Sequence, residues 1–144
     1  MANQAITITK NFDLRKITLD LTEELNRAAE IVKVDHFERL EKGQGVKGAL
    51  QRSEKKSGKT LVESGKMRNL VIEKATKENQ EAEIHPGEKQ KYPGTNVTMS
   101  DVGGFHQRGE GNLPVREWFG ITKNVEKRIM KLAELEIERQ IKRA

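Results

Sequence analysis

Residues 103–121 read GGFHQRGEGNLPVREWFGI, and this stretch has the greatest influence on how the chain folds. It contains Phe105, Trp118 and Phe119, three of only six aromatic residues in a chain of 144 in which 34% of residues are apolar. Because aromatic side chains bury a large area each, they dominate the energetics of a core this modest. We expect Trp118 and Phe119 to anchor a C-terminal helix onto a sheet, in preference to lining a ligand pocket.

The same stretch supplies the other candidate structural and interface residues. Pro114 fixes the backbone after an extended residue. Arg116 is placed to pair with a carboxylate or with carbonyl groups at the end of a neighbouring loop. Gly120 permits a tight approach of the backbone just before the helix. A turn near a subunit boundary is expected at Phe105, His106 and Gln107.

A long amphipathic helix is predicted after this stretch, at the C-terminal end of the chain. Thr122 or Asn124 can cap it, because short polar side chains accept hydrogen bonds from the first free amides of a helix. Apolar residues then recur at helical spacing and keep one face apolar to the end. These residues are Val125, Ile129, Leu132, Ala133, Ile137 and Ile141.

A second helix is predicted near the N-terminal end, from about Leu19 or Thr22 to Lys42. Asp20 or Thr22 can cap it, and Gly43 stops it. Its apolar stripe needs a sheet or another helix to cover it. The stripe consists of Leu21, Leu25, Ala28, Ala29, Val32 and Leu40.

Three short segments carry the alternation of apolar and polar residues that is typical of strands. They lie at residues 5–10, at about 69–75 and at 80–85. Their order and spacing suggest a meander of antiparallel strands. The predicted fold class is therefore α+β, with a small antiparallel β-sheet packed against an N-terminal and a C-terminal helix.

A single domain is predicted over residues 1–144, since a chain of this length suits one core. Two long loops interrupt it. Residues 43–60 are rich in glycine and lysine with little to bury, and residues 86–100 contain glycine and proline turns. We expect both to be flexible in the isolated subunit.

Composition gives no support for an enzyme. The chain has no cysteine, and its three histidines, His36, His85 and His106, lie far apart without acidic partners at zinc-site spacing. Each is expected to be a surface or interface residue. Gly58-Lys59-Thr60 lacks the earlier glycine and the preceding strand of a phosphate-binding loop. No catalytic, cofactor-binding or metal-ligating residue is therefore predicted, and no run of apolar residues is long enough to span a membrane.

A mild positive charge leaves an alternative function open. The formal net charge is +5, and Lys55, Lys56 and Lys59 form a basic run. Flexible lysines can contact phosphates without sequence preference, and such binding depends strongly on salt. A small basic nucleic-acid-binding protein is thus the alternative, although stacking aromatics do not accompany the run.

Three motifs in order resemble the phage virion morphogenesis family, which comprises tail-completion, tail-terminator or neck proteins of contractile-tailed phages. The first is LVESGKMR at residues 61–68, a Leu-x-x-Ser-Gly-x-Met pattern. The second is FHQRG at residues 105–109, an aromatic-His-Gln-x-Gly turn. The third is LPVREWFGI at residues 113–121, followed by the amphipathic helix. The resemblance covers about residues 20–144.

This resemblance implies a non-enzymatic α+β virion protein that forms a homo-oligomeric ring, expected to be a hexamer, without a cofactor. Such a ring would cap the completed tail tube and help to join the tail to the head. The implied partners are the tail tube, the sheath and the head-completion or connector proteins, with non-specific proximity to DNA in the channel and no membrane. The implied location is the neck or tail of the virion, assembled in the host cytoplasm.

Overall fold

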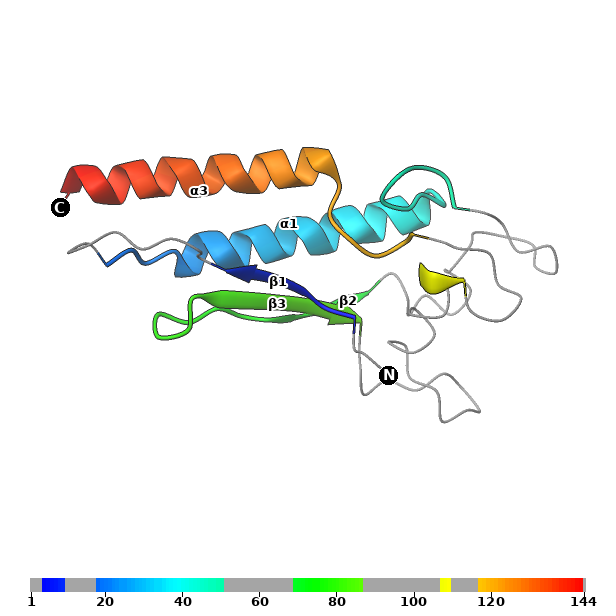
Figure 1. Ribbon diagram of the computed structural model, residues 1–144, viewed down its shortest axis with the longest axis horizontal. Helices are drawn as coiled ribbons and strands as arrows, with labels where there is room; N and C mark the ends of the chain where they lie inside the picture. The colour runs from blue at the N-terminus through cyan, green and yellow to red at the C-terminus, as the bar shows by residue number, and fades with distance from the viewer. Residues whose placement is uncertain (1–3, 10–17, 51–68, 87–106, 110–116, 144) are drawn as a thin grey trace.

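The computed structural model describes residues 4–9, 18–50, 69–86, 107–109 and 117–143 (Figure 1). Three strands and two long helices make up an α+β fold, as predicted. In chain order they are β1 (Ile6–Thr9), α1 (Thr22–Glu41), β2 (Leu70–Glu73), β3 (Glu81–Pro86) and α3 (Lys123–Arg143). Residues 107–109 form a separate helical turn.

The sheet is antiparallel throughout, with β3 at its centre and the strand order β1-β3-β2. Ile6 pairs with Ile84 on one side of β3, and Ile72 pairs with Ile84 on the other. The three predicted strands are therefore confirmed, but they do not form a simple meander. In the chain, α1 lies between β1 and the hairpin of β2 and β3. After this helix, β1 pairs with the second strand of the hairpin.

Helix α1 covers one face of this sheet. Asp20 Oδ1 accepts hydrogen bonds from the Thr22 backbone N–H at 3.0 Å and from Thr22 Oγ1 at 2.6 Å, just before the helix begins. Gly43, with φ of 68°, follows the last turn. Between these ends the predicted stripe is buried, and it packs on Ala82 and Ile84 of the central strand. The N-cap residue itself is Leu21, between the two predicted candidates, and Gly43 follows the helix as predicted.

Helix α3 forms an outer layer that runs antiparallel to α1 (Figure 1). It packs on α1, and Val125 is its one buried residue among those described. The sheet and both predicted helices are therefore present, with α1 directly on the sheet and α3 packed on α1. Three strands about 4.8 Å apart form a sheet scarcely wider than one helix, roughly 10–12 Å across, and α1 already occupies it.

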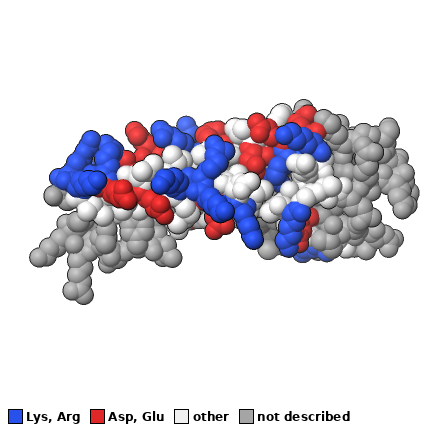
Figure 2. All heavy atoms as spheres, turned by 90° about the horizontal axis from the view of Figure 1, so that it is seen from above, with Lys and Arg blue, Asp and Glu red and all other residues white. Residues whose placement is uncertain are grey.

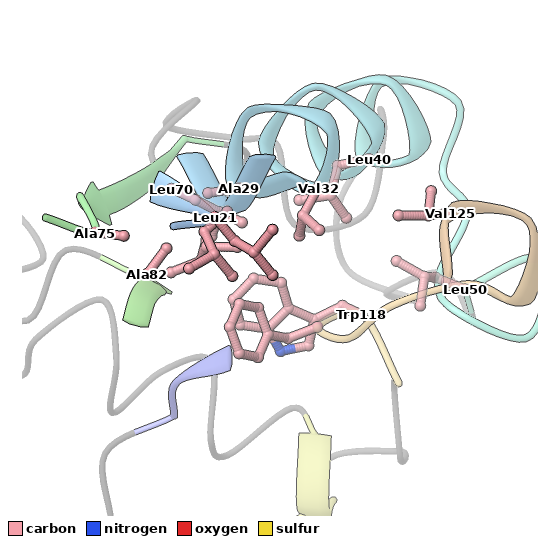
Figure 3. Packing of buried hydrophobic residues seen from close by; sticks show 13 residues of the cluster. Leu21, Ala29, Val32, Leu40, Leu50, Leu70, Ala75, Ala82, Trp118 and Val125 are labelled. Carbon is pink, nitrogen blue, oxygen red and sulfur yellow. The ribbon is translucent and has the colours of Figure 1, made fainter. Parts of the chain in front are cut away.

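The core lies between α1 and the sheet and continues to the turn before α3. Trp118, Leu40, Ile84, His36 and Val32 are among its largest fully buried side chains. Figure 3 shows Trp118 close to the buried apolar side chains of this cluster. Trp118 and Phe119 therefore occupy the core, as their size predicts, whereas Phe37 is exposed.

The start of the predicted flexible loop 43–60 has a defined fold. Gln44 and Ala49 form an antiparallel bridge, and Leu50 is buried. The Val46 backbone N–H donates to the Glu117 carbonyl at 2.8 Å, so the turn 43–50 packs beside the stretch that leads into α3. Residues 51–60 and 87–100 lie outside the described residues. In the described segments no helix is apolar and long enough to cross a bilayer.

Candidate functional site

Four of the eight candidate residues from the 103–121 stretch lie in the described part of the chain, and they form one cluster. Gln107, Trp118, Phe119 and Gly120 are held together by hydrogen bonds and ring contacts. The other candidates lie outside the described residues: Phe105, His106, Pro114 and Arg116.

The side chain of Gln107 binds the backbone ahead of α3. Its Oε1 accepts hydrogen bonds from the backbone N–H groups of Trp118, at 3.1 Å, and Phe119, at 3.2 Å. Its Nε2 donates to the Phe119 carbonyl at 3.1 Å. One carboxamide therefore satisfies three backbone groups that would otherwise be left unpaired in a partly buried site. Gln107 stabilises the position of the aromatic pair.

Three rings pack against one another at this point. The ring centroid of Trp118 lies 5.3 Å from that of His36 and 5.4 Å from that of Phe119. His36 comes from α1 and is fully buried, so the expectation of a surface or interface histidine was wrong at this position. It lies four residues beyond Val32 on the buried stripe of the helix, a spacing that could have indicated burial.

Arg39 is a site residue that the sequence interpretation missed. Its guanidinium, from the last turn of α1, donates to the carbonyls of Trp118 at 3.3 Å and Gly120 at 3.4 Å. Its Nε also donates to Asp35 Oδ2 at 2.7 Å, which pairs the buried charge with a carboxylate. This contact with carbonyls at a loop end is the role that the sequence suggested for Arg116. The Asp35–Arg39 spacing of four residues was the available signal.

Two glycines allow the turn 43–50 to approach this cluster closely. A Cβ on Gly45 would lie 2.4 Å from the Glu117 carbonyl oxygen, and one on Gly120 would lie 3.0 Å from Val46 Cγ2. The tight approach expected at Gly120 is therefore present. The cluster is a closed junction of α1, the turn 43–50 and the start of α3. Most of its polar groups bind backbone, and its rings are buried, so the cluster joins these three elements.

An apolar groove of about 380 Å³ lies elsewhere, where α1, α3 and β1 meet. Its walls include Ile8 of β1, Leu25 and Ala28 of α1, and Ile129, Ala133 and Ile137 of α3. Two carboxylates, Glu24 and Glu134, also border it. Burial raises the pKa of Glu24 above its usual range, and the nearby charges of Glu136 and Glu23 add to this effect. The groove is thus apolar with acidic groups at its border.

The apolar stripe of α3 is wider than the surface that α1 covers. Met130 and Ile141 share the groove side of the helix with Ile137, since they are separated by close to whole numbers of turns. Met130 is 54% exposed and Ile141 is 43% exposed. On the opposite margin of the contact with α1, Leu135 is 54% exposed. Figure 2 shows the molecule from the side of α3, with basic and acidic side chains intermixed around uncharged ones.

Comparisons of the chain with protein families, with curated proteins and with solved structures find no match.

Proposed function

We propose that this protein is a non-enzymatic structural subunit of a ring at the neck of a contractile-tailed phage, with a second copy of the chain packed on the groove side of α3. The three ordered motifs and the α+β fold with a helix near each end support this proposal. The observation that carries it is the uncovered apolar margin of α3 beside the groove. Exposed apolar surface rimmed by charged groups is typical of protein interfaces.

A closed ring accounts for both features of this surface. In a head-to-tail ring each subunit uses two different faces, so a groove on one copy receives a different face of the next. The apolar walls would then be removed from water, at roughly 25 cal/mol for each Å². Glu24 and Glu134 at the rim would pair with basic groups of the neighbour. The ring is expected to be a hexamer that caps the tail tube and contacts the connector.

The mass of the purified protein in solution tests this proposal. We expect sedimentation or light scattering at moderate salt to show a closed oligomer. The fraction of the protein in this oligomer should rise with protein concentration. The change Met130→Glu should shift it towards the monomer without loss of helical circular dichroism, because it puts a charge beside the groove. Val34→Glu is the matched control, since Val34 is 52% exposed on α1, away from the groove.

Particles from an infected host provide the decisive measurement. The proposal predicts this protein in purified neck or tail fractions, detected by mass spectrometry. It also predicts that deletion of the gene leaves unjoined heads and tails, or tails of irregular length, in electron micrographs. Absence from the particles, together with a normal deletion phenotype, would rule out the neck role. A gene position between head-completion and tail-sheath or tail-tube genes would support it.

Nucleic-acid binding is the alternative that the positive charge favours. The basic run Lys55, Lys56 and Lys59 lies outside the described residues, and Figure 2 shows that the Lys and Arg side chains on the α3 face alternate with Asp and Glu. A mixed surface of this kind favours weak contact with phosphates. The alternative predicts DNA binding with a steep salt dependence that is lost when these three lysines become glutamate.

A further inference from the structure

Glu73, Glu83 and His85 meet on the sheet face opposite α1. Glu73 of β2 pairs directly with Glu83 of the central strand, and His85 follows Glu83 by two residues. Successive side chains alternate between the faces of a strand, so all three project from the same face. Their ligand atoms all lie within 4.8 Å of one another. The sequence interpretation missed this group because Glu73 comes from a different strand.

The two carboxylates face each other across β2 and β3. Like charges directly opposite on adjacent strands destabilise a sheet. No lysine or arginine within the described segments forms an ion pair with Glu73 or Glu83; the imidazole of His85 is the one group paired with Glu73. A cation at this position would remove the repulsion.

The imidazole of His85 is oriented as a ligand. His85 is only 7% exposed, which contradicts the expectation of a surface histidine. Its Nδ1 lies 2.8 Å from the Pro86 carbonyl oxygen, which can only accept a hydrogen bond, so Nδ1 carries the proton. The other nitrogen, Nε2, lies 3.6 Å from Glu73 Oε1. Histidine ligands of metals commonly show this arrangement, with one ring nitrogen donating to a carbonyl and the other facing the ion.

We propose that Glu73, Glu83 and His85 bind a divalent transition-metal ion, with Zn²⁺ as the best match. One imidazole nitrogen and two carboxylate oxygens suit Zn²⁺, whereas Ca²⁺ and Mg²⁺ prefer oxygen ligands alone. Two carboxylates also balance the charge of the ion. The Glu73 side chain is 67% exposed, which provides a path from solvent and leaves room for water as a further ligand. The ion would tie β2 to β3 on the sheet face opposite α1.

Zinc titration of the full-length protein after removal of metal by a chelator tests the site. Competition with a chromophoric chelator should show one Zn²⁺ bound per chain. Glu73→Gln and Glu83→Gln keep the shape of the side chain and should each weaken binding by at least the roughly 10–100-fold that loss of an outer-shell partner costs. Glu81→Gln is the matched control, because Glu81 lies on the same strand and the same face, opposite Thr9. Its affinity should equal that of the unchanged chain.

A second measurement separates metal binding from simple protonation of the imidazole. Zn²⁺ should raise the thermal midpoint of the unchanged chain and of Glu81→Gln, and at the same concentration it should raise that of Glu73→Gln by less, because this variant binds more weakly. Glu73 is exposed, so this variant folds even where a change at buried His85 does not. Absence of binding at about 100 µM Zn²⁺ would overturn the proposal, and so would an affinity that Glu73→Gln and Glu83→Gln leave unchanged. An imidazolium paired with Glu73 would then explain the cluster.

Discussion

Carboxamide side chains connect segments that are distant in the sequence. Gln107 binds the backbone at Trp118 and Phe119, and Asn26 of α1 binds both the N–H and the carbonyl of Ala75. Gln80 accepts a hydrogen bond from the Leu21 N–H, at 2.7 Å. A carboxamide both donates and accepts, so it pairs with a peptide group much as another strand would. These single residues replace backbone pairing that the short strands cannot supply.

Trp118 is expected to contribute more to stability than any single aliphatic residue of the core. Its side chain is fully buried against His36 and Phe119, so Trp118→Ala should lower the free energy of unfolding by about 3–5 kcal/mol. Urea unfolding followed by circular dichroism would measure the change. Val34→Ala, at an exposed position of α1, should stay within about 0.5 kcal/mol. A loss below about 1 kcal/mol at Trp118 would contradict its place in the core.

The junction shows which residue roles the sequence could reveal. The size of Trp118 and Phe119 was sufficient to predict their burial, because each aromatic side chain removes a large apolar area from water. The roles of Arg39 and His36 depend on which face of α1 meets the turn before α3. That geometry comes from tertiary packing, so the sequence pattern alone did not indicate it.

Local sequence patterns predicted which helices and strands form better than they predicted where these elements pack. The polar residues before α1, Gly43 after it and its apolar stripe predicted a start at about Leu19 or Thr22 and an end at Lys42, and the helix runs from Thr22 to Glu41. Helix ends depend on local hydrogen bonds and spacing, which a sequence pattern reveals. That α3 packs on α1 depends on tertiary packing, which the local patterns do not specify. The pairing of β1 with β3 also depends on how α1 packs on the sheet. The alternation of apolar and polar residues in β1 therefore did not predict its partner strand.

The end of α3 is joined to the start of α1 by a polar network that should respond to acid. Glu136 accepts hydrogen bonds from Arg139 and from Gln140, and Gln140 also binds the backbone of Asp20. The hydrogen bonds from Arg139 and Gln140 lower the pKa of Glu136 from 4.5 to about 2. Its charged form is therefore favoured in the folded protein.

The lowered pKa of Glu136 predicts the direction in which the stability of the protein changes with pH. The stabilisation is fully present above pH 4.5 and is lost as the pH falls towards 2, because the unfolded chain takes up the proton first. Glu136→Gln lacks the titrating group, so the difference in unfolding free energy between it and the unchanged chain should shrink over this range. Urea midpoints at several pH values would measure it. Glu138→Gln, on the same helix, controls for net charge, and equal slopes for all three proteins would contradict the prediction.

At the scale of the whole molecule, the outer helix presents exposed apolar residues, Met130 and Ile141, beside the groove. If copies associate through the groove side of α3, association stabilises the folded state by mass action. The thermal midpoint of the unchanged chain should then rise with protein concentration. Met130→Glu should have a midpoint that is independent of concentration, while Val34→Glu should behave like the unchanged chain. Calorimetry over a hundredfold range of concentration would distinguish these outcomes.

The groove also links folding to the order of events in assembly. Its walls come from β1, α1 and α3. Residues as far apart in the sequence as Ile8 and Ile137 must therefore come together before the groove exists. Contacts between distant parts of a chain close large loops and have a high entropic cost, so they form late, whereas the hairpin of β2 and β3 is local. A nascent or damaged chain therefore has no complete groove. If copies associate through the groove, this surface would act as a checkpoint, because only a folded subunit could present it to another.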